Sequence, residues 1–181
     1  MGFVFTMYAQ GNVIVEEKEQ HTAGVLRLLK VQYINVFLAK AILVYGVSYL
    51  LAVFTLVING FGVLNFIATS IFIIPFLLMC LFIGAILGDV AKNTIDVSLY
   101  GWPILLVYFT IEGLVYSSIN LKILYVLPNY HMQRGLYFIE RGEFTEAAQY
   151  IFVPILWMLL AFLFLRKKQK DAKTKRMDDF N

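Results

Sequence analysis

Four long apolar runs determine what this chain can fold into. They extend over about residues 36–58, 63–87, 97–116 and 150–165. About 20 residues of helix cross the roughly 30 Å of hydrocarbon in a bilayer, so runs of this length are typical of membrane-spanning helices. Their length excludes buried strands, and their lack of period-2 alternation excludes a β-barrel. We therefore expect an all-α, polytopic transmembrane helical bundle with about four complete spans.

The composition agrees with an integral membrane protein. Of the 181 residues, 60% are hydrophobic and only 15% are charged. A soluble domain of this size could not bury so much apolar surface. We therefore treat residues 1–181 as a single transmembrane domain, multi-pass in the cell membrane. The single cysteine, Cys80, lies within an apolar run and cannot form an internal disulfide, so we interpret it as a packing residue.

The first apolar segment, residues 3–15, is too short to cross a bilayer. The acidic residues after it are unlike a secretory signal, which carries basic residues first. Two interpretations stay open: a re-entrant or interfacial segment, and the second half of a helix whose first half is missing. We favour the partial span. It should form a helix that continues, straight or sharply bent, into the acidic segment, with its amino end stopping within the hydrocarbon.

Residues 16–30 form the most informative polar segment. No proline interrupts them, and apolar side chains recur every three or four residues, as on one face of a helix. Acidic residues stand at the front of this segment, where the helix dipole favours negative charge, and Lys30 stands at its end. We predict an amphipathic helix at the cytoplasmic membrane surface. An interfacial anchor that only determines topology is the alternative interpretation.

Basic residues predict the orientation. The segment 166–181, after the last apolar run, contains seven basic residues. The positive-inside rule places it in the cytoplasm as a basic tail. Four spans return the chain to the side on which it began, so residues 16–30 and the loop around Lys92 are predicted to share that side. Residues 117–149 then form an extracytoplasmic loop.

Two motifs resemble those of a known family. The sequence EKEQHT at residues 17–22, followed by leucines up to Leu29, is similar to a segment of ABC-2 type transporter permeases that usually reads E-[KR]-E-x-G-T. Lys40 matches a lysine common at the start of the following span. Residues 127–142 resemble the family's pattern before its last span.

The chain also departs from that pattern. His21 replaces the usual glycine, and Val31 and Gln32 stand where a proline is often found. The family's permeases have six spans. The resemblance therefore implies that the first span and part of the second are absent from this chain.

The resemblance implies a membrane-spanning permease subunit that exports a drug, peptide or amphipathic compound. In the family, residues 16–30 correspond to a coupling helix that docks on a separate cytoplasmic ABC ATPase. The expected partners are that ATPase, a second permease copy or paralogue, and the lipid bilayer, with no nucleic acid. No cofactor is expected on this chain, because ATP and Mg²⁺ belong to the ATPase and no G-x-x-x-x-G-K-[ST] run is present. The implied coupling residues are Glu16, Glu17, Glu19, Thr22, Leu26 and Leu29.

The remaining candidates are single residues. Glu112 lies within the third run, where a carboxylate is costly and could contribute to a substrate or proton pathway. We favour the alternative, a structural hydrogen bond near the end of the span. Gly84 and Gly88 form a G-x-x-x-G pattern that allows close helix packing. His131 with nearby glutamates does not have the spacing of a metal site, so we expect no metal.

Two other function classes stay open. The first is a non-catalytic membrane anchor or truncated permease relic without transport activity. The second is an intramembrane enzyme, which no paired catalytic spacing such as H-E-x-x-H supports. We therefore expect a transport subunit and no catalytic residues on this chain.

Overall fold

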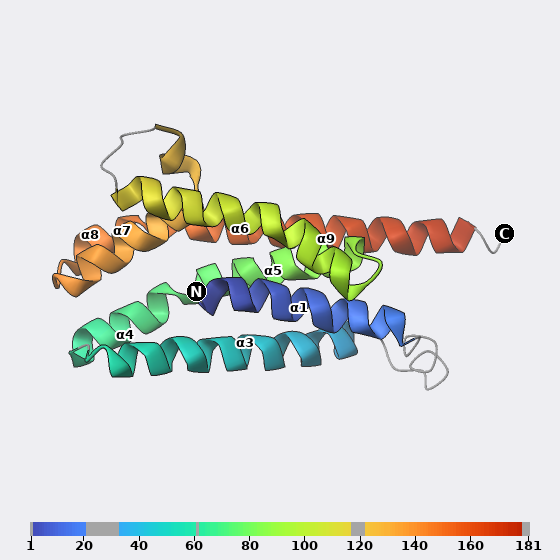
Figure 1. The fold of residues 1–181 in the computed structure, drawn as a ribbon, viewed down its shortest axis with the longest axis horizontal. Coiled ribbons are helices and arrows are strands. Elements are labelled where there is room, and N and C mark those ends of the chain that lie inside the picture. Colours follow the sequence, from blue (N-terminus) through green and yellow to red (C-terminus); the bar gives the residue numbers. More distant parts are fainter. Residues whose placement is uncertain (1, 21–32, 61, 117–121, 179–181) are drawn as a thin grey trace.

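Helices make up the fold, and no β-strand occurs among the residues that the structure describes. The computed structural model describes residues 2–20, 33–60, 62–116 and 122–178. Figure 1 shows the helices packed along one long axis. This confirms the predicted all-α bundle. In chain order the elements are α1 (Gly2–Glu19), α3 (Tyr33–Ile58), α4 (Val63–Phe72), α5 (Ile74–Val90), α6 (Thr94–Tyr116), the 3-10 helix η1 (Lys122–Val126), α7 (Pro128–Glu140), α8 (Phe144–Gln149) and α9 (Phe152–Asp178).

Within the described ranges, four helical segments are long and apolar enough to cross a membrane, and each overlaps one of the predicted runs. Their outward surfaces are apolar: Ile42 and Leu50 of α3, for example, are 70% and 67% exposed. A continuous apolar surface of this kind is costly in water and favourable against lipid. The four-span prediction is therefore confirmed. The segments are Leu38–Ile58, Val63–Val90, Thr94–Ile111 and Phe144–Lys167.

The second span is two helices and not the single run predicted over residues 63–87. α4 ends at Phe72 and α5 begins at Ile74, with Pro75 in the first turn of α5. Proline has no N–H to donate and is well accommodated in the first turn of a helix, which favours a helix start at this position. Pro103, by contrast, lies inside α6. Figure 1 shows α4 turned away from the direction of α5.

The predicted loop over residues 117–149 contains helical structure. Its described part holds η1, α7 and α8, and α7 packs against α4, α6 and α9. Gly142, with φ of 76°, ends α7 in a Schellman motif: its N–H donates to Ile139 O at 2.9 Å, and the Glu143 N–H donates to Phe138 O at 2.9 Å. The described part of this segment is thus a folded part of the bundle, because α7 also has an apolar face to bury.

The last helix continues beyond the predicted span. α9 extends to Asp178, so the backbone of most of the predicted tail, residues 166–181, is helical. Figure 1 shows this end of α9 projecting past the other helices. The side chains after Lys167 lie outside the described part of the chain.

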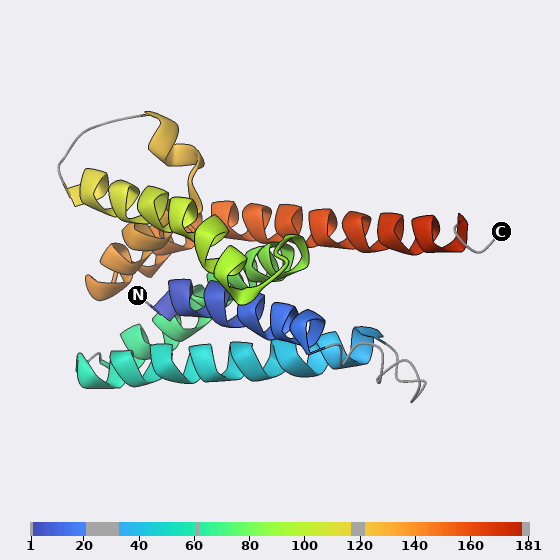
Figure 2. The same cartoon turned by 45° about the vertical axis from the view of Figure 1, so that its right-hand side comes forward.

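α1 lies at the centre of the bundle, against α3, α5 and α6 (Figures 1 and 2). It runs parallel to α5, because Gly84 faces Met7 and Gly88 faces Gly11, four residues further along both helices. A Cβ on Gly84 would collide with the Met7 carbonyl, and one on Gly88 would lie 2.6 Å from Gly11 O. The G-x-x-x-G pair is therefore the close-packing surface that the sequence predicted.

Residues 3–15 continue without a break into the acidic residues, as expected, because α1 ends only at Glu19. At 1.5 Å per residue, its 18 residues extend over about 27 Å. Figure 1 places its amino end beside the junction of α4 and α5.

Candidate functional site

The last turn of α1 contacts three other helices. The name α1 junction is used below for residues 16–20 together with their partners on α3, α5 and α6. Its partners are the start of α3, the carboxyl end of α5 and the amino end of α6, all at the same end of the bundle (Figure 1). This arrangement follows from the direction of the helices, since α1 and α5 finish where α3 and α6 begin.

An ion pair joins α1 to α3 at the junction. The Lys40 Nζ lies 2.9 Å from Glu17 Oε1, and it also donates to the Val13 carbonyl at 3.4 Å. The Glu17 side chain is only 11% exposed and that of Lys40 is 32% exposed. Burial makes Glu17 depend on its partner, because an isolated buried carboxylate is poorly solvated.

Lys18 joins α1 to the end of α5. Its Nζ donates to the carbonyls of Gly88, Asp89 and Ala91 at 2.8, 2.6 and 3.2 Å. The last carbonyls of a helix have no intrahelical partner, and a cation is favoured there by the helix dipole. An ammonium group has three donors, so it satisfies three carbonyls at once.

Glu19 joins α1 to the start of α6. Its Oε1 accepts from the Thr94 N–H at 3.1 Å, one of the N–H groups that the first turn of α6 leaves without an intrahelical partner. Asn93 and Asp96 complete this end: Asn93 Oδ1 accepts from the Asp96 N–H at 2.7 Å, and Asp96 Oδ2 accepts from the Lys92 N–H at 3.0 Å. The turn between α5 and α6 is therefore stabilised both by Glu19 of α1 and by hydrogen bonds within the turn itself.

The acidic residues stand at the carboxyl end of a helix, and the prediction that they begin one is wrong. Glu16–Glu19 form the last turn of α1, where the helix dipole disfavours negative charge. Lys40 and the amino end of α6 offset this cost for Glu17 and Glu19. Glu16 is exposed and accepts from Gln20 Nε2 at 2.9 Å. The other implied coupling residues, Thr22, Leu26 and Leu29, lie outside the described residues.

The two single-residue candidates, Glu112 and His131, lie apart from the α1 junction. Glu112 is in α6, one residue beyond the apolar segment Thr94–Ile111, and its side chain lies outside the described part. His131 Nε2 lies 2.7 Å from the Tyr125 carbonyl, so this nitrogen carries the proton and the ring is used structurally. Burial raises the pKa of the neighbouring Tyr130 phenol above its usual value. Among the described residues, no group of three or more His, Cys, Asp or Glu could hold a metal ion.

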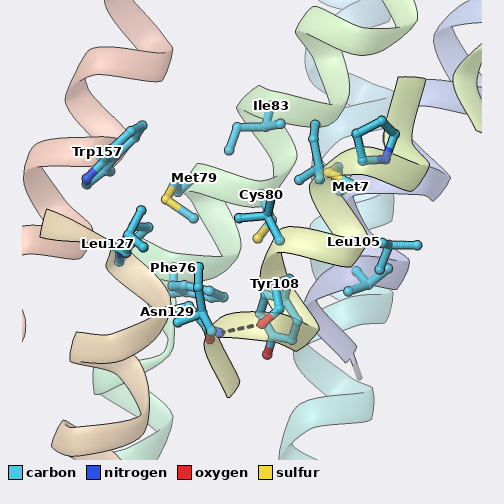
Figure 3. A pocket seen from close by; sticks show the side chains of 16 residues that line it. Met7, Phe76, Met79, Cys80, Ile83, Leu105, Tyr108, Leu127, Asn129 and Trp157 are labelled. Atoms are coloured by element: carbon cyan, nitrogen blue, oxygen red, sulfur yellow. Dashed lines mark hydrogen bonds between the residues drawn. The ribbon is translucent and has the colours of Figure 1, made fainter. Parts of the chain in front are cut away.

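A second candidate site is a cavity of about 380 Å³ among α1, α5, α6, α9 and the start of α7 (Figure 3). Sequence reasoning missed it, because its lining is apolar and is assembled from five separate segments. The sequence alone does not distinguish an apolar residue that faces lipid from one that faces the protein core or a cavity. The lining residues are Val4, Met7, Phe76, Met79, Cys80, Ile83, Pro103, Ile104, Leu105, Val107, Tyr108, Ile111, Leu127, Pro128, Asn129 and Trp157.

Comparison with known proteins decides the family. The model of a family described as ABC-2 family transporter protein matches residues 1–166, which is most of the chain. The chain belongs to the ABC-2 transporter family. No curated protein and no solved structure gives a match. The resemblance seen in residues 17–22 and 127–142 is thus confirmed. Both the α1 junction and the cavity lie within the part of the chain that carries the ABC-2 match, and membership makes this chain a transport permease of the membrane.

Proposed function

We propose that this ABC-2 permease is the membrane subunit of an ATP-driven exporter and that a separate cytoplasmic ATPase moves it through the α1 junction. The observation that carries the proposal is the set of contacts made by Glu17, Lys18 and Glu19, three consecutive residues that reach three different helices. A force applied to the segment after Glu19 would reach α3, α5 and α6 together.

The mechanism divides the coupling segment into two parts. Residues 21–30, including Thr22, Leu26 and Leu29, are proposed to contact the ATPase. Glu17 and Glu19 are proposed to act as positioning residues, because their side chains engage this chain's own helices. Closure of the ATPase would then shift the ends of the spans as a rigid body, and a packed bundle transmits such a shift without deforming continuously.

The position of the basic residues supports a cytoplasmic location for the α1 junction. The carboxyl end of α9, which carries the basic residues, lies at the same end of the bundle as the α1 junction (Figure 1). The positive-inside rule favours the cytoplasm for that end. We further propose that two permease copies, or this chain and a paralogue, pair with two ATPase subunits to export a drug, peptide or amphipathic compound.

The experiment is co-expression of the full chain with candidate ABC ATPases of the same genome, followed by co-purification and assay of transport and ATP hydrolysis. Leu26→Asp and Leu29→Asp should reduce ATPase binding. Lysine substitutions at Glu16, Glu17 and Glu19 together should weaken binding or uncouple hydrolysis from transport. Lys92→Glu, an exposed charge change at the same end of the bundle, is the control and should change neither. The proposal is wrong if the triple substitution leaves both binding and transport intact.

A further inference from the structure

α6 contains a proline in its interior. Pro103 lies near the middle of the helix. Because proline has no N–H, it cannot donate to the Leu99 carbonyl four residues earlier, and its ring crowds that carbonyl. Sharp bends in helices are found at such positions. Figure 2 shows α6 changing direction part-way along its length. We therefore divide α6 into an inner half, residues 94–101, and an outer half, residues 103–116.

The inner half of α6 is fixed to α1. Val97 and Gly101 are four residues apart and share one face of the helix. Val97 is fully buried, and a Cβ on Gly11 would lie only 2.9 Å from its Cγ1. A Cβ on Gly101 would lie 2.5 Å from the Tyr8 ring, so this ring packs directly on the α6 backbone. Together with the hydrogen bond from the start of α6 to Glu19, these contacts hold the inner half against α1 along its length.

The outer half of α6 packs against other elements. Ile111 is buried in a cluster with Leu124 of η1 and Tyr130 of α7. The Tyr108 carbonyl accepts from Asn129 Nδ2 at 3.3 Å, at the end of the cavity next to α7 (Figure 3). The two halves of α6 therefore belong to different groups of helices, and Pro103 lies where the groups meet.

The cavity separates the outer half of α6 from α5. Its volume is about 380 Å³, and the facing side chains of the two helices do not touch across it. A movement that narrows it would gain dispersion contacts. Among the described residues that line the cavity none is charged, so such a movement breaks no ion pair. The lining residues from α6 are Pro103, Ile104, Leu105, Val107, Tyr108 and Ile111.

We propose that α6 is a hinged helix that bends at residues 99–103. The bend moves the outer half, together with η1 and α7, toward α5 and narrows the cavity, while the inner half stays fixed on α1. The hydrogen bond that Pro103 cannot make lowers the cost of bending. Together with the coupling proposed above, the hinge would carry a movement of α1 to the far end of the bundle. The hinge itself is a property of this chain, and its test uses no ATPase, so the two proposals fail separately.

The test is the distance between pairs of spin labels on cysteines introduced into the full chain, in lipid nanodiscs and a Cys80→Ser background. Exposed positions Leu106 and Leu50 report the outer half of α6 against α3. Exposed positions Ile95 and Ile42 report the inner half against α3. We expect two distances for the outer pair and one for the inner pair. Distributions of equal width for the two pairs, whether narrow or broad, would overturn the proposal.

Proline variants test the hinge position. Pro103→Ala supplies the N–H that the Leu99 carbonyl lacks, so the outer pair should narrow to the width of the inner pair. Pro154→Ala is the matched control, because Pro154 lies in the first turn of α9, where an N–H has no intrahelical partner. It should leave the two distances of the outer pair unchanged. The same effect from both variants would contradict a hinge at Pro103.

Cavity variants test the direction of the movement. Ile83→Trp places an indole in the cavity and should remove the shorter distance of the outer pair, because the outer half can no longer approach α5. Ile86→Trp, on the same helix and also partly buried but outside the lining, should keep both distances. These variants still decide if Pro103→Ala does not fold. A shorter distance that persists in Ile83→Trp would overturn the proposal that the movement narrows the cavity.

Discussion

Lys40 of α3 and Glu17 of α1 form an ion pair, with 2.9 Å between Nζ and Oε1. The pair lies at the end of the bundle where Lys18 and Glu19 reach α5 and α6. A residue implied by the family to face an ATPase therefore turns its side chain toward its own membrane helices. Within the α1 junction, Glu17 positions the helix that precedes residues 21–30.

The first prediction concerns this ion pair. Lys40→Met leaves the Glu17 carboxylate largely buried without its cation, and it should lower the free energy of unfolding by on the order of 1–3 kcal/mol. Glu17→Gln should cost less, because the neutral amide can still accept a hydrogen bond from Lys40. Thermal unfolding in detergent measures both. Glu16→Gln, an exposed change in the same turn, is the control and should have little effect. A Lys40→Met protein as stable as the wild type would show that the pair contributes nothing.

The second prediction concerns Lys18. Lys18→Met removes the ammonium that satisfies the carbonyls of Gly88, Asp89 and Ala91, so the turn between α5 and α6 should open more often. Hydrogen exchange of the amides in residues 89–96 should become about tenfold faster, the equivalent of about 1.4 kcal/mol. Lys92→Met changes an exposed lysine in the same turn and should not accelerate exchange. Unchanged exchange in the Lys18 variant would show that the Lys18 ammonium does not stabilise the turn between α5 and α6.

The third prediction compares two helix glycines. Gly84→Ala places a methyl group against the Met7 carbonyl and should separate α1 from α5, at a cost of about 1–3 kcal/mol. Gly46→Ala in α3 has open space around the new methyl group and should be neutral or stabilising by roughly 0.5–1 kcal/mol. Melting temperatures of the two variants test the comparison. Equal temperatures would mean that α1 and α5 are not in close contact.

The fourth prediction concerns Gln10 of α1. Its side chain is fully buried, and neither amide atom has a hydrogen-bond partner among the described residues. Gln10→Met keeps a similar volume and removes the desolvation cost, so it should stabilise the protein by about 1–2 kcal/mol. A melting temperature that falls would instead show that a buried water molecule satisfies the amide.

Two structural details could have been predicted from the sequence: the division of the second apolar run into two helices, and the end of α7. Pro75 lies near the middle of the second apolar run, and proline is favoured in the first turn of a helix. The division into α4 and α5 agrees with this preference, although Pro103 lies inside the unbroken α6. Gly142 likewise follows the α7 residues where a helix-ending glycine is expected.

The sequence by itself determined the membrane class, the four spans and the close-packing glycines Gly84 and Gly88. These properties are local: the length of an apolar run and the absence of a side chain act in the same way whatever the neighbours are. The match of the chain to its family also depends on sequence alone.

Only the tertiary structure decided the partners of the charged residues and the existence of the cavity. Glu17 looks like an exposed helix-start residue in the sequence, yet the packing of α1 against α5 brings it beside Lys40, and a one-turn shift of α1 would separate them. Asn129 lines the cavity because α7 packs against α6. Ion pairs and cavities depend on positions across several helices, and the spacing of residues along one segment does not contain that information.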